Sequence, residues 1–530
     1  MGVKGLWKYI EQHGVVYDAP KEMGGQGSSW VLRPNHLFID MNCILHIAFE
    51  KTHGSTTRRV LQGIRRLVLA ILRQVRPSST LGVVFDGIAP LAKIPTQKER
   101  RASLSPHPPS RSPASSDGLF SCDLLNAEVP LRKPEIGSGS QFVYACEEFL
   151  EAMLREMELA HDALATWTTR RMSRSLEPGE GELKISRLIR QVWQDDARKG
   201  VYRPEDDVVL VGNDSDLILV ALVATPYREL TILHPDTFAR TCLGVLFEQW
   251  RKDLPNPPLP LDLLPSYRVD FVFIRLLAGG DYHDGLRQHV EELWRNYRNL
   301  RANSGFFRRP LLRGEDLSLD VEFLRRIVGV GKRKEDRWNG GGSKTKGRQL
   351  LRAALWGLKG LIFGRCVDYA FESPDLGRGG VSVADLRAAA LSRGIGRAIG
   401  TDSPVSAIST PPADSTSSDH PESPTSLTTM ELEDPDRPAQ ARLTVLEQYI
   451  AVMGVRGRYS KELDRAIDQS TDDHGKKFTM SKSTSFLVGM VKKIMANVDI
   501  NRLSKAERAL YNPLTCQDEP TADEGALLRL

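Results

Sequence analysis

The sequence has few of the features that mark secreted, zinc-binding and membrane-spanning proteins. Its 530 residues include only six cysteines, and no two of them form a C-x-x-C pair. This argues against a disulfide framework and a zinc ribbon, and favours a reducing compartment. No stretch reaches the roughly 18 uninterrupted apolar residues of a membrane span, and no apolar signal-peptide segment stands at the start. Leu6 occupies the position where a myristoylation signal needs Ser or Thr. We therefore expect an intracellular protein, nuclear or cytoplasmic, without a membrane partner.

A strong excess of one charge is also missing. The net charge of +5 and the pI of about 8.8 permit a polyanionic partner such as nucleic acid but do not require one. Lys and Arg are spread along the chain, so no targeting signal stands out. With 41% hydrophobic residues the chain can bury a large core. At roughly 100–200 residues per domain, we expect two or three lobes.

What is present is a regular alternation of two patterns. Short apolar runs rich in β-branched residues, each ending in or near an acidic residue, predict buried parallel strands at 36–40, 81–86 and 208–212. Apolar residues at helical spacing predict helices at 58–75, 142–161 and 183–197. The alternation predicts an α/β fold with a mostly parallel central sheet flanked by helices, together with a smaller helical lobe.

Two stretches, residues 103–116 and 401–438, are dense in Ser, Pro and Thr and predict disorder. After the second, apolar helical spacing resumes from Arg442. We expect an N-terminal domain at 1–285 with a low-complexity insertion at 103–118, a helical continuation at 286–400, a linker at 401–438 and a small helical lobe at 439–530.

Seven carboxylates stand where the local pattern changes from strand or turn to helix. They are Asp40, Asp86, Glu180, Glu182, Asp214, Asp216 and Asp281. Any one of them alone is better explained as a helix cap or a solvated face. As a set they favour a shared cation site, because hard divalent cations such as Mg²⁺ or Mn²⁺ need several oxygen ligands. We expect two ions, which would allow two-metal phosphodiester hydrolysis.

Several motifs, taken in order, resemble the XRN family of 5′-to-3′ exoribonucleases. They are MGVKGLWKYI, FIDMNCILH, VVFDGIAPLAKIPTQKERR, PGEGELKI, LVGNDSDLILVAL and DFVFIRLLAGGDYHDGL. The resemblance implies a nuclease core of the type shared with PIN and flap-endonuclease-like proteins, and it assigns all seven carboxylates to metal binding. It also implies a single-stranded RNA substrate with a 5′-monophosphate. Protein partners cannot be predicted.

The resemblance assigns four residues after Asp86 to the pocket that holds the 5′-monophosphate. They are Lys93, Gln97, Arg100 and Arg101. Their spacing agrees with this, because it brings the side chains near one face of a helix as phosphate donors. An ordinary solvated basic helix is the alternative. Such a pocket implies exclusion of a cap or triphosphate and processive digestion.

The same resemblance assigns His46 to base stacking, although a His in an apolar helix is more often a core residue. Trp338 lacks the flanking tyrosines of the family's stacking Trp, so we do not assign it this role. Lys4 and Leu183 replace the family's usual Pro and His, and the Pro-rich stretch at 103–116 follows the basic residues directly. The long C-terminal continuation of the family is missing, which suggests a compact or divergent member.

Two other functions stay open. MGVKGLW and GGDY also resemble flap endonucleases, which are DNA nucleases with the same chemistry. The Gly-rich turn of their helix-hairpin-helix is absent after Tyr282, and this favours the exoribonuclease. The second alternative is a catalytically inactive RNA-binding scaffold on the same fold. Seven acidic residues at the seven expected positions argue against it.

Overall fold

The computed structural model describes residues 3, 5–13, 16–17, 30–53, 56–102, 130–254, 258–286, 289–302, 305–314, 316–329, 342–369, 371, 381–392, 443–453, 459–470 and 484–511. The predicted low-complexity stretches at 103–116 and 401–438 lie outside these residues. The chain divides into two compact units. The first comprises Met1–Leu246, Lys359–Ser373 and Ala439–Leu530, and the second comprises Phe247–Leu358 and Pro374–Pro438. The predicted domain limits stay predictions.

A seven-stranded sheet forms the centre of the first unit. Its strands are β1 (Val16–Tyr17), β2 (His36–Asp40), β3 (Thr80–Val84), β4 (Thr169–Ser173), β5 (Val208–Val211), β6 (Leu230–Leu233) and β7 (Arg240–Cys242). They are ordered β1-β7-β6-β5-β2-β3-β4. The five strands from β6 to β4 are parallel, while β7 is antiparallel to both of its neighbours. The prediction of an α/β fold with a mostly parallel sheet is confirmed.

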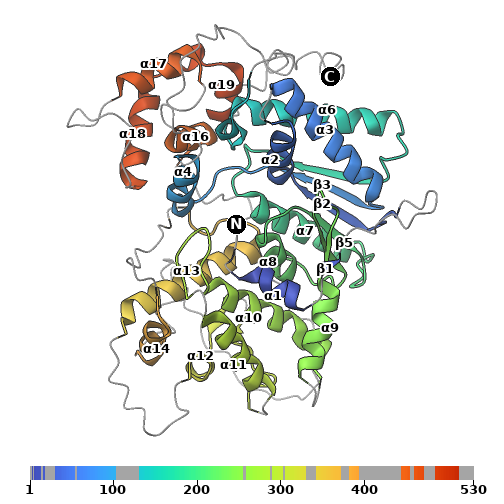
Figure 1. Ribbon diagram of the computed structural model, residues 1–530, viewed down its shortest axis with the longest axis vertical. Helices are drawn as coiled ribbons and strands as arrows, with labels where there is room; N and C mark the ends of the chain where they lie inside the picture. The colour runs from blue at the N-terminus through green and yellow to red at the C-terminus, as the bar shows by residue number, and fades with distance from the viewer. Residues whose placement is uncertain are drawn as a thin grey trace, which may run out of the picture. The chain divides into compact units, whose positions relative to one another are not determined.

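Helices cover both faces of the sheet (Figure 1). Leu37 and Ile39 of β2 pack into a buried cluster with α2 (Met41–Lys51), α3 (Thr57–Gln74) and α6 (Gln141–Leu159). Phe38 points to the opposite face, as alternation along a strand requires, and its ring fills the space that a side chain at Gly82 would occupy. The helices α7 (Gly181–Arg198) and α8 (Asp216–Val223) lie against strands of this sheet, in contact with β2, β3 and β6. The central parallel strands β2, β3 and β5 are therefore buried on both sides.

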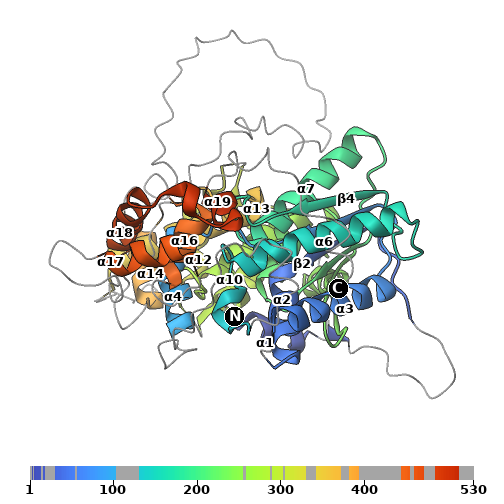
Figure 2. The same ribbon diagram turned by 90° about the horizontal axis from the view of Figure 1, so that it is seen from above.

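The C-terminal helices belong to the first unit. They are α16 (Val445–Met453), α17 (Lys461–Gln469), α18 (Thr484–Ala496) and α19 (Lys505–Tyr511). α16 packs on α4 (Ile94–Ala102), and α19 packs on α6. Figures 1 and 2 both show α16 beside α4, although the two helices are far apart in the sequence. Among the described residues, this unit also contains α1 (Leu6–Gln12), η1 (Leu91–Lys93), η2 (Lys133–Ile136) and η6 (Ile500–Arg502).

The second unit is mostly helical. It contains η3 (Leu261–Leu263), α10 (Leu264–Leu276), α11 (Val290–Ala302), α12 (Val321–Ile327), α14 (Val383–Leu391) and a hairpin of β8 (Leu312–Arg313) and β9 (Ser318–Leu319), while α9 (Leu243–Asp253) and α13 (Lys344–Phe363) cross the unit boundaries. Packed aromatic rings fill its core, among them Trp250, Phe271 and Trp294. None of the helices in the described ranges is long and apolar enough to cross a membrane.

Candidate functional site

Four of the predicted carboxylates follow three neighbouring parallel strands. Asp40 is the last residue of β2 and caps α2, where its Oδ1 accepts a hydrogen bond from the Asn42 N–H at 3.0 Å. Asp86 follows β3. Asp214 and Asp216 follow β5, and α8 begins at Asp216. Because β5, β2 and β3 are adjacent and parallel, these side chains share the carboxyl edge of the sheet, where ligands bind in open α/β folds.

Glu180 and Glu182 reach the same edge from the start of α7. The N–H of Gly181 between them donates to Asp86 Oδ1 at 2.6 Å. A Cβ at Gly181 would come within 2.9 Å of that oxygen and within 3.4 Å of Asp40 Oδ1. Only glycine therefore lets the beginning of α7 approach the carboxylates so closely.

The carboxylates perturb one another electrostatically. Burial, followed by the charges of Asp86 and Asp214, raises the pKa of Asp40 to about 8. Burial also raises the pKa of Glu182, where the nearby Lys93 ammonium opposes the shift and neighbouring carboxylates add to it. Lys93 forms an ion pair with the buried carboxylate of Glu180. Five of the predicted metal ligands are thus coupled electrostatically, and Asp216 joins this cluster because its N–H donates to Asp214 Oδ1.

The described residues alone do not form the geometry of a metal centre. In the part of the chain that the structure describes, no group of three or more His, Cys, Asp or Glu side chains is placed so that it could hold a metal ion. Asp216 Oδ1 accepts from the Val3 N–H at 3.0 Å, and Asp214 Oδ1 accepts from the Asp216 N–H at 3.1 Å. Asp281 follows α10 in the second unit. The donor chemistry nevertheless fits a hard divalent cation, because buried carboxylates that repel one another are stabilised by positive charge.

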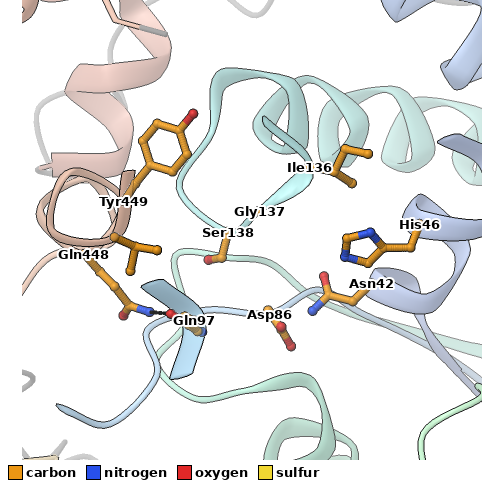
Figure 3. A pocket seen from close by; sticks show the side chains of 10 residues that line it. Asn42, His46, Asp86, Gln97, Ile136, Gly137, Ser138, Gln448 and Tyr449 are labelled. Atoms are coloured by element: carbon orange, nitrogen blue, oxygen red, sulfur yellow. Dashed lines mark hydrogen bonds between the residues drawn. The ribbon is translucent and has the colours of Figure 1, made fainter. Parts of the chain in front are cut away.

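A cavity of about 70 Å³ adjoins the carboxylates (Figure 3). Its lining residues are Asn42, His46, Asp86, Gln97, Ile136, Gly137, Ser138, Gln448, Tyr449 and Val452. The ring of His46 points into it from α2, while Gln97 and Gln448 approach each other on the opposite side. The exposed position of His46 excludes the alternative of a core histidine.

Two of the four predicted phosphate-binding residues have side chains that the structure describes, and one of these two lines the cavity. That residue is Gln97, whereas Lys93 is paired with Glu180. Arg100 and Arg101 lie on α4, but their side chains fall outside the described part of the structure, as does the whole of Trp338.

Residues 1–236 match the family described as "XRN 5′-3′ exonuclease N-terminus". The chain carries an XRN 5′-3′ exonuclease N-terminal domain. It is also distantly homologous to 5′-3′ exoribonuclease 2 over about half its length. The protein of that name from Eremothecium gossypii is 30% identical over 39% of this chain and 22% of its own length. The one from Yarrowia lipolytica is 25% identical over 53% of this chain and 33% of its own length. The one from Schizosaccharomyces pombe is 24% identical over 49% of this chain and 31% of its own length. The matched regions therefore cover about a fifth to a third of these relatives.

The XRN domain includes the six clustered carboxylates, His46 and α4, but the cavity also takes residues from beyond it. Sequence reasoning missed Asn42, Ser138, Gln448 and Tyr449. Only α16 carries a usable signal, because the polar pair Glu447-Gln448 interrupts an otherwise apolar helix, VLEQYIAVM. Nothing local in the sequence connects that helix to the cavity.

Proposed function

We propose that this chain is a Mg²⁺- or Mn²⁺-dependent 5′-to-3′ exoribonuclease that degrades single-stranded RNA with a 5′-monophosphate, in RNA decay or processing. One observation carries the proposal: Asp86 belongs to the carboxylate cluster and also lines the cavity that contains His46 and Gln97. A 5′ end held in this cavity would lie directly beside the carboxylates. That arrangement suits removal of nucleotides from the end of a strand. The XRN domain and the names of the relatives agree with it.

The carboxylates are assigned to two divalent cations, with Asp281 included on the resemblance of its motif. Bound cations would activate water and stabilise the leaving oxygen of the phosphodiester. Burial of Asp40 and Glu180 keeps competing water away and strengthens their hold on positive charge. Until a cation binds, Lys93 balances part of the negative charge through Glu180.

The 5′ end is assigned to the residues of α4 and to His46. Arg100, Arg101 and Lys93 supply positive charge for the phosphate, and Gln97 supplies an uncharged donor. His46 stacks on the terminal base, as aromatic rings do in proteins that bind single strands. A pocket built from these groups would accept a 5′-monophosphate and exclude a cap or triphosphate.

The test is a time course with Mg²⁺ and one single-stranded RNA that carries a 5′-monophosphate, a 5′-hydroxyl or a 5′-triphosphate. The matching DNA serves as the control substrate. Rapid loss of the monophosphorylated RNA alone, without long intermediates, is the expected result. Equal cutting of all ends, or preference for branched DNA, would favour a flap-endonuclease-like enzyme. Binding without cleavage would favour an inactive scaffold.

Asp214→Asn should abolish cleavage while RNA binding persists. The matched control is Asp195→Asn, which makes the same change at the far end of α7, roughly 20 Å from Glu182 along the helix. Asp195 pairs with Arg171 and Arg198 at the surface, so its loss should leave cleavage unchanged.

A further inference from the structure

We propose that Gln448 in α16 is a positioning residue that turns the amide of Gln97 so that its NH₂ group faces the 5′-phosphate. The C-terminal helices would then help to recognise the 5′ end. This inference rests on the proposed function, because it assigns a role at the same site.

Gln448 is buried on a helix whose neighbouring side chains are mostly apolar. Its Oε1 accepts a hydrogen bond from the Ala89 N–H at 2.9 Å, and its Nε2 lies 3.4 Å from Gln97 Oε1. Both partners belong to the segment between β3 and the middle of α4, more than 300 residues away in the sequence. Because a buried amide must be hydrogen-bonded to avoid a large cost, these two contacts fix its orientation.

The backbone N–H of Ala89 determines the polarity of the whole chain of hydrogen bonds. A backbone N–H can only donate, so the oxygen of Gln448 must face Ala89. The NH₂ group of Gln448 is then left to donate to Gln97, which must present its oxygen in that direction. The NH₂ group of Gln97 is consequently turned away from Gln448. Gln97 lines the cavity beside Gln448 (Figure 3), so the group that it has left for a phosphate there is a donor and not an acceptor.

The experiment measures how strongly each variant prefers 5′-phosphorylated over 5′-hydroxyl RNA, both in kcat/KM and in equilibrium binding of a nuclease-resistant RNA without metal. Gln448→Met is nearly isosteric and removes both hydrogen bonds that orient Gln97. We therefore expect the preference for 5′-phosphorylated RNA to fall several-fold, mainly because KM for that RNA rises. Gln448→Glu keeps an acceptor for Ala89 but places a second acceptor opposite Gln97. The Gln97 amide should then rotate so that its NH₂ group faces the new carboxylate and its oxygen faces the cavity. We expect the preference to fall roughly tenfold or more, as it does when a hydrogen bond to a charged group is lost.

Gln141→Met is the matched control. Gln141 also joins the core to the C-terminal helices, through a 3.2 Å hydrogen bond from its Nε2 to Ser504 Oγ, but it does not line the cavity. It should leave the preference intact. A double-mutant cycle with Gln97→Met separates a positioning role from general disruption. If Gln448 acts through Gln97, adding Gln448→Met to Gln97→Met should cause no further loss.

Additive losses in the cycle, or an unchanged preference in Gln448→Glu, would overturn the inference while the proposed function stands. A wild-type protein that cleaves RNA without regard to its 5′ end would remove the phosphate pocket, and the inference with it. A wild-type protein that neither cleaves RNA nor prefers the 5′-phosphate in binding would refute both. If the wild type prefers the 5′-phosphate in binding but does not cleave RNA, the hydrolytic activity is refuted. The double-mutant cycle measured in binding then decides the role of Gln448: no further loss supports it, and additive losses overturn it.

Discussion

The charge on Asp86 has opposite consequences for stability and for activity. Its negative charge helps to raise the pKa values of Asp40 and Glu182, so it destabilises the metal-free protein. Asp86→Asn keeps the acceptor for the Gly181 N–H but removes the repulsion. We expect the free energy of unfolding of the metal-free variant to exceed that of the wild type by about 1 kcal/mol. Mg²⁺ should stabilise the variant less than it stabilises the wild type, and the variant should not cleave RNA. Thermal unfolding with and without Mg²⁺ measures this. A lower metal-free midpoint in the variant would contradict the electrostatic account.

Glu147 should make stability depend on pH. Burial is the main cause that raises its pKa from 4.5 to about 7, although its carboxylate accepts from the Ser175 N–H at 2.7 Å. Between these pH values the folded state keeps a proton that the unfolded state has lost. This contribution to stability is therefore complete below about pH 4.5 and is lost as the pH rises through about 7, to the extent of about 3 kcal/mol.

Glu147→Gln should remove this part of the pH dependence, because an amide does not titrate. Urea unfolding of both proteins at pH 5 and pH 8 measures this. The free energy of unfolding of the variant, relative to that of the wild type, should be higher at pH 8 than at pH 5. Glu156→Gln, at an exposed position on the same helix, is the control and should keep the wild-type slope. Equal slopes for wild type and Glu147→Gln would show that another group is responsible.

At the scale of elements, three of the buried parallel strands could be predicted from the sequence. The prediction for β2 matches its limits, and those for β3 and β5 differ by one or two residues, because a parallel strand covered on both faces is a continuous apolar run. β4 was missed because TRRMS, at the edge of the sheet, is polar and only partly buried. The clustered carboxylates could be predicted for a related reason, since adjacent parallel strands bring their carboxyl ends together. The contribution of α16 to the cavity could not be predicted from the sequence, because it depends on packing between distant segments.

The start of α7 supplies a prediction at this scale. Gly181→Ala would place a methyl group against the Asp86 and Asp40 oxygens, so we expect a large loss of cleavage as α7 shifts away. Gly489→Ala is the matched control, since a Cβ there meets nothing within 4 Å and the residue lies inside α18. It should stabilise the protein by roughly 0.5–1 kcal/mol without affecting cleavage. Activity assays and thermal unfolding of both variants distinguish the two effects. Full activity in Gly181→Ala would show that the close approach is not needed.

At the scale of the whole molecule, the C-terminal helices should hold to the core by packing as well as by the chain connection. α16 fits closely against the core, because a Cβ added to Gly139 would lie only 2.6 Å from the Val445 carbonyl oxygen. Gln448 of the same helix also accepts a hydrogen bond from the Ala89 N–H. A protease site inserted within residues 401–438 allows the full-length protein to be cut after folding. We expect the two pieces to elute together in gel filtration and to keep the preference for a 5′-phosphate. Adding Gln448→Glu to the cut protein should lower that preference as in the intact chain. Separation of the pieces, or loss of the preference on cutting alone, would mean that the connection itself holds the cavity together.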